Sequence, residues 1–124
     1  MKTIFAVAVG GALGSVCRLG VNVACARWLG VHNAWGTFFV NAVGCFLIGL
    51  LAGSRFGGDP MTTALLATGF LGGLTTFSSF ALETLRMQQS SQAAWALANV
   101  AANVIVGLIC VGAGLMAGRR WWGL

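Results

Sequence analysis

The chain of 124 residues is 58% hydrophobic and only 7% charged, with a mean hydropathy of +0.89. Soluble domains carry about 25% charged residues, and a fold of this length cannot bury so much apolar surface, so a soluble globular domain is excluded. The net charge of +5 comes from scattered residues rather than from a basic stripe, which argues against nucleic-acid binding. The composition therefore predicts a protein surrounded by a lipid bilayer, whose anionic headgroups suit the positive charge.

Four segments are long and apolar enough to form transmembrane helices, which need about 20 residues each. They cover residues 3–28, 35–54, 62–86 and 93–118. Polar and turn residues fill the breaks, including the only proline, Pro60. The pattern of apolar segments thus predicts that residues 1–124 form one all-α transmembrane domain of four helices. The tryptophans fall near the predicted helix ends, where the headgroup layer favours them: Trp28, Trp35, Trp95, Trp121 and Trp122.

The four cysteines lie inside apolar runs and form no CxxC pair. Cysteine behaves in such surroundings as a small hydrophobic residue. The spacing therefore predicts neither a disulfide framework nor a zinc site.

An even number of spans places both termini on the same side of the membrane. The side of the termini then carries four basic residues, Lys2, Arg55, Arg119 and Arg120, and the other side carries Arg27 and Arg86. This difference is small by the standard of the positive-inside rule. Insertion in both orientations and a fixed orientation with cytoplasmic termini therefore both remain open.

Glycine pairs at four-residue spacing occur in two predicted helices. Gly10 and Gly14 lie in the first helix, and Gly114 and Gly118 lie in the fourth. Small residues at this spacing let helices approach closely in lipid. Because four helices alone enclose little interior for a polar solute, we expect the chain to form an oligomer.

Arg18 lies well inside the first predicted helix, where a charged residue is a candidate for function. Its side chain could extend along the helix to the nearer headgroups. It could instead form a cationic mouth of an anion pathway. The residue alone leaves both interpretations open.

Other polar residues inside the spans also have two interpretations. Asn41 could bond across a helix interface or offer its two amide protons to an anion. Asn99 and Asn103 are four residues apart and share one helix face. They could form hydrogen bonds between packed helices, or they could be part of a polar track. Glu83 is the only acidic residue inside a span; it could relay protons or pair with Arg86 three residues later.

The third segment contains the stretch GFLGGLTTFSSF, residues 69–80, where glycine and hydroxyl residues interrupt a long apolar run. Each glycine weakens a helix by about 1 kcal/mol relative to alanine, and the hydroxyls can bend it further by bonding to backbone carbonyls. We therefore expect a broken helix, which the membrane tolerates only beside protein or a watery cavity. Phe77 and Phe80 share the next helix face, and their electropositive ring edges could accept an anion. A bent, packed helix with aromatic core residues is the alternative.

Three motifs resemble those of the Fluc family of small, dual-topology bacterial fluoride channels, and the resemblance covers nearly the whole chain. They are GGALGSVCR in the first helix, GTFFVNAVGCFLIG in the second and GFLGGLTTFSSFALE in the third. The third motif is long and chemically unusual. The resemblance implies an antiparallel homodimer of four-helix subunits in the bacterial inner membrane. It also implies a passive fluoride-selective channel, not an enzyme, that exports fluoride through two pores.

The resemblance assigns roles to individual residues. Phe77 and Phe80 match the phenylalanines whose ring edges face fluoride, and Asn41 matches the amide of the pore. Arg18 matches the arginine of the vestibule. The hydrogen-bonding track would comprise Ser78, Ser79 and Glu83. On the fourth helix Asn103, one turn before Gly107, could compensate for the serine that relatives carry at the position of Gly107.

The resemblance further implies a structural sodium ion at the centre of the dimer. Gly72 and Thr75 match the residues at the helix break whose backbone carbonyls, from both subunits, hold this ion. Two positions depart from the family pattern, because Ala81 and Gly107 stand where relatives carry hydroxyl residues. These departures leave the exact path of the ion open.

Two other functions compete with a channel. A small proton-coupled multidrug exporter needs a carboxylate in its first helix, and this chain has none there. A membrane subunit without transport activity would explain the glycine-rich packing but not the phenylalanine pair. Fluoride efflux from liposomes would separate these three functions.

Overall fold

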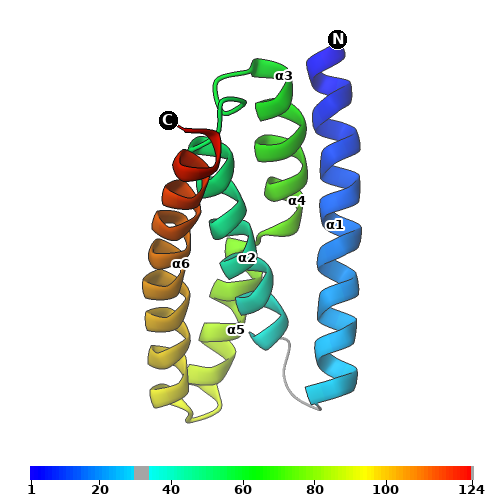
Figure 1. The fold of residues 1–124 in the computed structure, drawn as a ribbon. Helices are drawn as coiled ribbons and strands as arrows, with labels where there is room; N and C mark the ends of the chain where they lie inside the picture. The colour runs from blue at the N-terminus through cyan, green and yellow to red at the C-terminus, as the bar shows by residue number, and fades with distance from the viewer. Residues whose placement is uncertain (30–33, 124) are drawn as a thin grey trace.

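The computed structural model describes residues 1–29 and 34–123, which form a bundle of long helices (Figure 1). Four helices in this part of the chain are long and apolar enough to cross a membrane, as the sequence predicts. Three are the continuous helices α1 (Lys2–Leu29), α2 (Ala34–Ala52) and α6 (Ala93–Trp122). The third span is assembled from α3 (Pro60–Thr62), the π-helical η1 (Thr63–Leu71), α4 (Gly72–Leu74) and α5 (Phe77–Gln89).

Successive spans run in opposite directions, so the two termini lie at the same end of the bundle (Figure 1). α2 packs most extensively against α6, and α1 packs against η1 and α4. The bundle therefore consists of two close pairs, α2 with α6 and α1 with the first part of the third span, and α5 joins them by packing against α6.

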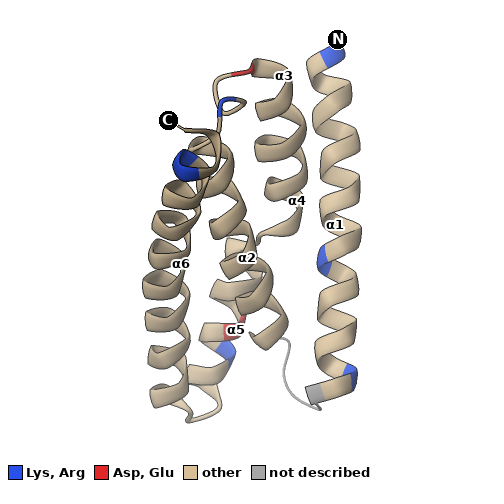
Figure 2. Ribbon diagram, in the orientation of Figure 1, with Lys and Arg blue, Asp and Glu red and all other residues tan. Residues whose placement is uncertain are grey.

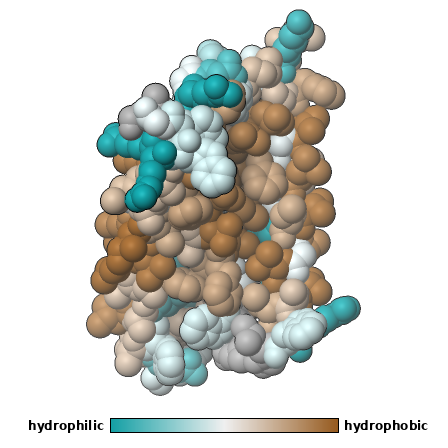
Figure 3. Space-filling view, in the orientation of Figure 1, coloured by the Kyte–Doolittle hydropathy of each residue, from teal (hydrophilic) through white to brown (hydrophobic). Residues whose placement is uncertain are grey.

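On the face that Figure 3 shows, the bundle is apolar over its middle and more polar at its two ends. Large apolar side chains such as Leu13 and Leu108 are 57% and 69% exposed. Lysine and arginine lie mainly at the helix ends, with one basic position inside α1 (Figure 2). An apolar belt of this extent matches lipid rather than water, and the tryptophans lie near helix ends as predicted.

Glycines allow both close helix pairs. A Cβ atom on Gly14 would overlap the carbonyl oxygen of Phe70 and lie 2.9 Å from the amide nitrogen of Leu74. A Cβ atom on Gly114 would overlap the carbonyl oxygen of Phe46 in α2. The predicted close approach at the two glycine pairs is thus confirmed, and backbone-to-backbone packing of this kind is the usual mode of helix association in lipid.

The interruption of the third span lies beyond the glycines that were expected to cause it. Gly69 belongs to η1, and Gly72 and Gly73 belong to α4. Gly72 has helical backbone angles, φ −63° and ψ −33°. The reason is packing: a Cβ atom on Gly73 would overlap the carbonyl oxygen of Gly11 in α1. Gly69 and Gly73 bring the third span against α1, and two threonines interrupt it.

Asp59 begins the third span at the end of the bundle that holds the termini. Its carboxylate accepts a hydrogen bond from the Thr62 amide at 2.7 Å, and Pro60 occupies the first helical position. This is an ordinary helix N-cap. The bond from Thr62 lowers the pKa of the exposed Asp59 carboxyl below its usual value, so this group is ionised at neutral pH.

Candidate functional site

The third span is interrupted at Thr75 and Thr76, whose backbones are extended. Their angles are φ −81°, ψ 156° and φ −152°, ψ 114°. Thr75 still donates its amide to the Leu71 carbonyl at 2.9 Å. Thr76 instead donates its amide to Asn41 Oδ1 at 2.8 Å. In a continuous helix this amide would bond to the Gly72 carbonyl, so the interruption releases the carbonyl oxygen of Gly72, an exposed residue beside the cavity described below.

Thr76 then serves as the N-cap of α5. Its hydroxyl accepts a hydrogen bond from the Ser79 amide at 3.2 Å and donates one to Ser79 Oγ at 3.2 Å. The hydroxyl of Ser78 also lies 3.2 Å from that of Thr76. The predicted track residues Ser78 and Ser79 are therefore gathered around one buried threonine at the start of a helix, where unpaired amides favour negative charge.

Asn41 of α2 connects the interruption to α6. Its amide nitrogen lies 3.3 Å from the Thr76 carbonyl and 3.2 Å from Asn103 Oδ1, and it can donate to both. Asn103 in turn donates to Asn99 Oδ1 at 3.1 Å, and Asn99 donates to Thr84 Oγ1 at 2.9 Å. The asparagines are thus both packing contacts and a continuous polar chain across α2, α5 and α6.

A cavity of about 420 Å³ lies beside the interruption. Its lining includes six of the residues predicted to form the site: Asn41, Gly72, Thr75, Phe77, Phe80 and Asn103. The Phe77 and Phe80 rings are 5.6 Å apart between centroids and inclined at 54°. Asparagine side chains, the residues of the interruption and tilted aromatic rings therefore line one space in an otherwise apolar bundle, and the asparagine amides are hydrogen-bonded to one another and to the interruption.

Glu83 lies outside this cavity and contacts α2. Its Oε1 accepts a hydrogen bond from Thr37 Oγ1 at 2.7 Å. The predicted alternative, an ion pair with Arg86, is absent from the structure; the Arg86 side chain is exposed. Ser79 and Glu83 are four residues apart and share a helix face, so Glu83 continues the polar face of α5 away from the interruption.

Arg18 of α1 extends toward the interruption. Its Nη1 lies 3.5 Å from the Thr75 carbonyl oxygen, at the outer limit of a hydrogen bond. Its half-buried side chain therefore places positive charge near the cavity and not at the headgroups.

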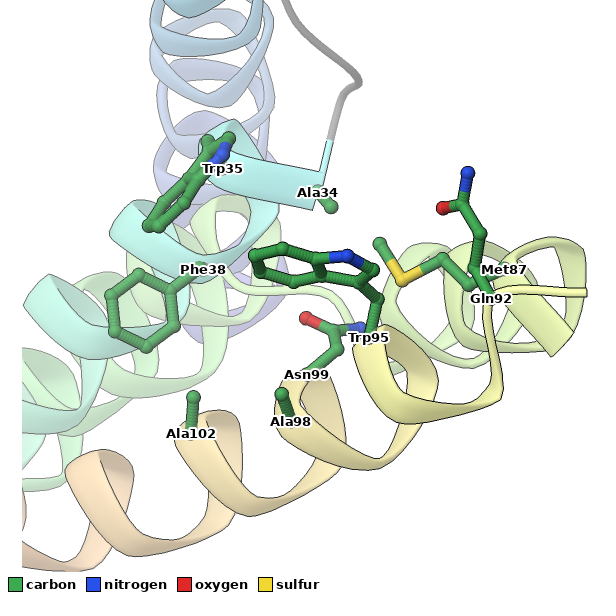
Figure 4. Close-up of a pocket in the computed structure, with 9 residues that line it drawn as sticks. All are labelled: Ala34, Trp35, Phe38, Met87, Gln92, Trp95, Ala98, Asn99 and Ala102. Carbon is green, nitrogen blue, oxygen red and sulfur yellow. The ribbon is translucent and has the colours of Figure 1, made fainter.

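A second cavity, of about 380 Å³, lies where α2 and α6 begin (Figure 4). Figure 4 shows the rings of Trp35, Phe38 and Trp95 around it, with the amides of Gln92 and Asn99 at its edge. The Asn99 amide nitrogen is already bonded to Thr84. Aromatic side chains thus surround this cavity, whereas the cavity beside the interruption is the one lined by the residues predicted to form the site.

Two polar residues of the bundle were not singled out from the sequence. Thr37 is only 1% exposed and holds Glu83. Asn22 of α1 has a buried side-chain oxygen, Oδ1, for which the described residues provide no hydrogen-bond partner. This oxygen packs against Gly36 of α2, so closely that a Cβ atom on Gly36 would overlap it. The four-residue spacing from Arg18 to Asn22 places both on one face of α1 and was the signal that could have identified Asn22.

Replacing Asn41 with leucine should destabilise the folded protein by about 1–3 kcal/mol, because the Thr76 amide would be left buried without an acceptor. Asn41→Asp keeps this acceptor but turns a second carboxyl oxygen toward the Thr76 carbonyl and Asn103 Oδ1, so it should also be destabilising. Thermal unfolding in detergent measures both. Equal stability of the leucine variant and the wild type would contradict the role assigned to Asn41.

Residues 5–115 match the family model described as CrcB-like protein, Camphor Resistance (CrcB). The chain belongs to the CrcB-like family. A relative from Allorhizobium ampelinum is 43% identical over 96% of this chain and 98% of its own length. A relative from Paracoccus denitrificans is 45% identical over 94% of both chains, and one from Dehalococcoides mccartyi is 40% identical over 95% and 93%. All three are named fluoride-specific ion channel FluC.

These comparisons confirm the family that the sequence motifs resemble, over nearly the whole chain. The CrcB-like relatives are named as ion channels, so this is a family of transport proteins and not of enzymes. With four helices suited to cross a membrane, the chain is a multi-pass membrane protein.

Proposed function

We propose that this CrcB-like chain is a passive fluoride-selective channel that exports fluoride across the bacterial inner membrane. The observation that carries the proposal is the cavity at the helix interruption, where Asn41, Asn103 and the Phe77–Phe80 pair meet. The names of the relatives support fluoride as the ion. The exporter alternative lacks its essential group, because α1 contains no carboxylate.

Fluoride is small and strongly hydrated, so a pathway must replace its water with donors at close range. The Asn41 amide, the hydroxyls of Ser78 and Ser79 and the edges of the two phenylalanine rings supply such donors without a fixed charge. Weak, successive contacts of this kind let an ion leave as well as enter. Arg18, close to the Thr75 carbonyl, would raise the local concentration of anions.

The proposal includes an antiparallel homodimer with two pores. The Phe77 side chain is 79% exposed in the single chain, beside the cavity it lines. A second subunit packed on this face would close the cavity and supply its remaining wall.

The proposed dimer also contains a structural sodium ion. Among the described residues no group of three His, Cys, Asp or Glu gathers, so the ligands would be backbone oxygens. The carbonyls of Gly72 and Thr75 fit this role, since the interruption frees the first from its helical donor and oxygen ligands suit hard cations. Two subunits would contribute four such oxygens, and the ion would offset the negative charge of nearby fluoride.

The function is tested by reconstituting the purified protein in liposomes loaded with potassium fluoride and following external fluoride with an electrode. We expect rapid efflux once valinomycin allows potassium to balance the charge, and none from protein-free liposomes. Absence of efflux from protein that elutes as a single folded species would overturn the proposal.

Removing sodium should slow fluoride efflux, because the central carbonyls would repel one another without a cation. The comparison uses protein purified and reconstituted throughout in sodium or in N-methylglucamine, a cation too large for a carbonyl site. Restored efflux after sodium is added back is the expected control. Equal efflux in both cations would contradict the sodium site while leaving fluoride transport intact.

A further inference from the structure

Three arginines gather at the end of the bundle that holds the termini. Arg55 lies in the connection from α2 to α3, and Arg119 and Arg120 lie in the last turn of α6. Figure 2 shows the basic positions of these two segments beside each other. The backbones agree, because a Cβ atom on Gly53 would lie 3.0 Å from the Arg119 amide nitrogen. Two distant segments of the chain therefore bring three exposed basic residues to one corner of the bundle.

The connection that carries Arg55 has a fixed shape. The hydroxyl of the buried Ser54 donates a hydrogen bond to the Leu51 carbonyl at 2.8 Å and accepts one from the Phe56 amide at 3.2 Å. The Phe56 ring then packs edge-to-face against Trp122 of α6, with 6.3 Å between centroids. Hydrogen bonds on one side and an aromatic contact on the other thus hold Arg55 close to the end of α6.

Aromatic rings lie among the arginines. The Arg55 guanidinium is 4.8 Å from the centroid of the Phe56 ring, the geometry of a cation–π contact. Trp122 follows Arg119 by three residues and shares its helix face. The adjacent Trp121 is 82% exposed. Tryptophan favours the headgroup layer of a membrane, so this corner of the bundle lies at the depth of lipid phosphates.

The acidic side chains of the chain are occupied elsewhere. There are only two, Asp59 and Glu83. Asp59 caps α3, and Glu83 accepts a hydrogen bond from Thr37 of α2. The end of the bundle that holds the termini carries four basic residues against Asp59 alone. Among the described residues, the positive charge of this corner is therefore in excess and available to an anion from outside the chain.

A phosphate attached to an apolar tail suits this corner best. Guanidinium groups bind phosphate through paired N–H donors, and basic pockets between transmembrane helices bind lipid headgroups. Met116, one turn before the arginines of α6, is 73% exposed and offers apolar surface to an acyl chain. The helix dipole alone would favour basic residues in the last turn of α6, but it accounts for neither Arg55 nor the rings.

We propose that Arg55, Arg119 and Arg120, with the Phe56–Trp122 ring pair, bind the headgroup phosphate of an anionic phospholipid. The bound headgroup would join the α2–α3 connection to the end of α6. None of these residues lines the cavity at the interruption, so the proposal does not rest on fluoride transport.

The test measures lipid binding to delipidated protein in detergent by native mass spectrometry. It compares phosphatidylglycerol with phosphatidylcholine of the same acyl chains. We expect the wild type to bind phosphatidylglycerol about tenfold more tightly. Arg55→Gln should weaken this binding about fivefold, and Arg55→Gln combined with Arg119→Gln about 25-fold, while phosphatidylcholine binding stays unchanged.

The matched control combines Arg27→Gln with Arg86→Gln, which removes the same charge at the other end of the bundle and should keep the wild-type preference. Glycerol phosphate, a headgroup without acyl chains, should not compete at the same concentration. Equal wild-type affinity for the two lipids would overturn the proposal, even if a variant misfolds. So would an equal loss in the control, or full binding by the Arg55 and Arg119 double variant. Competition by glycerol phosphate would assign the corner to a soluble anion instead of a lipid.

Discussion

Replacing both Phe77 and Phe80 with isoleucine should slow fluoride efflux by about a hundredfold, equivalent to about 2.7 kcal/mol in the barrier. Isoleucine fills much of the same space but has no electropositive ring edge to face an anion. Both rings line the cavity beside Asn41, so their loss removes donors at one point of the path. The measurement is electrode-detected efflux from liposomes with matched protein content.

The matched control is Phe5→Ile on α1. Phe5 is 72% exposed and Phe77 is 79% exposed, but Phe5 does not line the cavity. The control should therefore leave efflux unchanged. If the double variant conducts as fast as the control, the phenylalanine pair is not part of the fluoride path.

Replacing Gly14 with alanine should destabilise the bundle by about 3 kcal/mol or more. The added methyl group would overlap the Phe70 carbonyl oxygen. The obstacle is backbone, which cannot rotate away, so α1 would have to separate from the third span. This separation would also weaken the packing that positions the interruption. Thermal unfolding in detergent and the yield of monodisperse protein measure the effect.

Gly20→Ala on the same helix provides the control. A Cβ atom there meets nothing within 4 Å, and alanine favours a helix by about 1 kcal/mol over glycine. The two variants should therefore change stability in opposite directions. A loss of stability of the same size at both positions would show that glycine at position 14 is not required for close packing.

The helices and their order could be predicted from the sequence because each span is a long apolar run between polar breaks. The predicted ends agree with the structure to within a few residues, apart from the fourth, which continues to Trp122. The additional turn carries Arg119 and Arg120, charged residues that end an apolar pattern without ending a helix.

The motif located the interruption within residues 69–80, and the resemblance placed Thr75 at it, but its cause could not be predicted from composition. Glycine weakens a helix in isolation, so the glycines were expected to be part of the cause. In the bundle the missing side chains of Gly69 and Gly73 allow α1 to pack closely, and both residues stay in helical segments. What draws the Thr76 amide out of the helix is Asn41, a residue 35 positions earlier. A contact between such distant residues is invisible to any local pattern.

The same limit applies to the polar side chains. Helical spacing correctly placed Asn99 and Asn103 on one face, but only the structure shows that Asn103 contacts Asn41. Spacing also suggested that Glu83 pairs with Arg86, whereas Thr37 on another helix is its partner. Spacing identifies which residues share a helix face, and packing between helices determines which residues they contact.

The central claim is that the cavity at the interrupted third span conducts fluoride selectively. The most direct test loads the same liposomes with equal potassium fluoride and potassium chloride and follows both anions with electrodes after valinomycin is added. We predict rapid release of fluoride while chloride stays inside. Release of both anions at similar rates, or of neither from folded protein, would contradict this account.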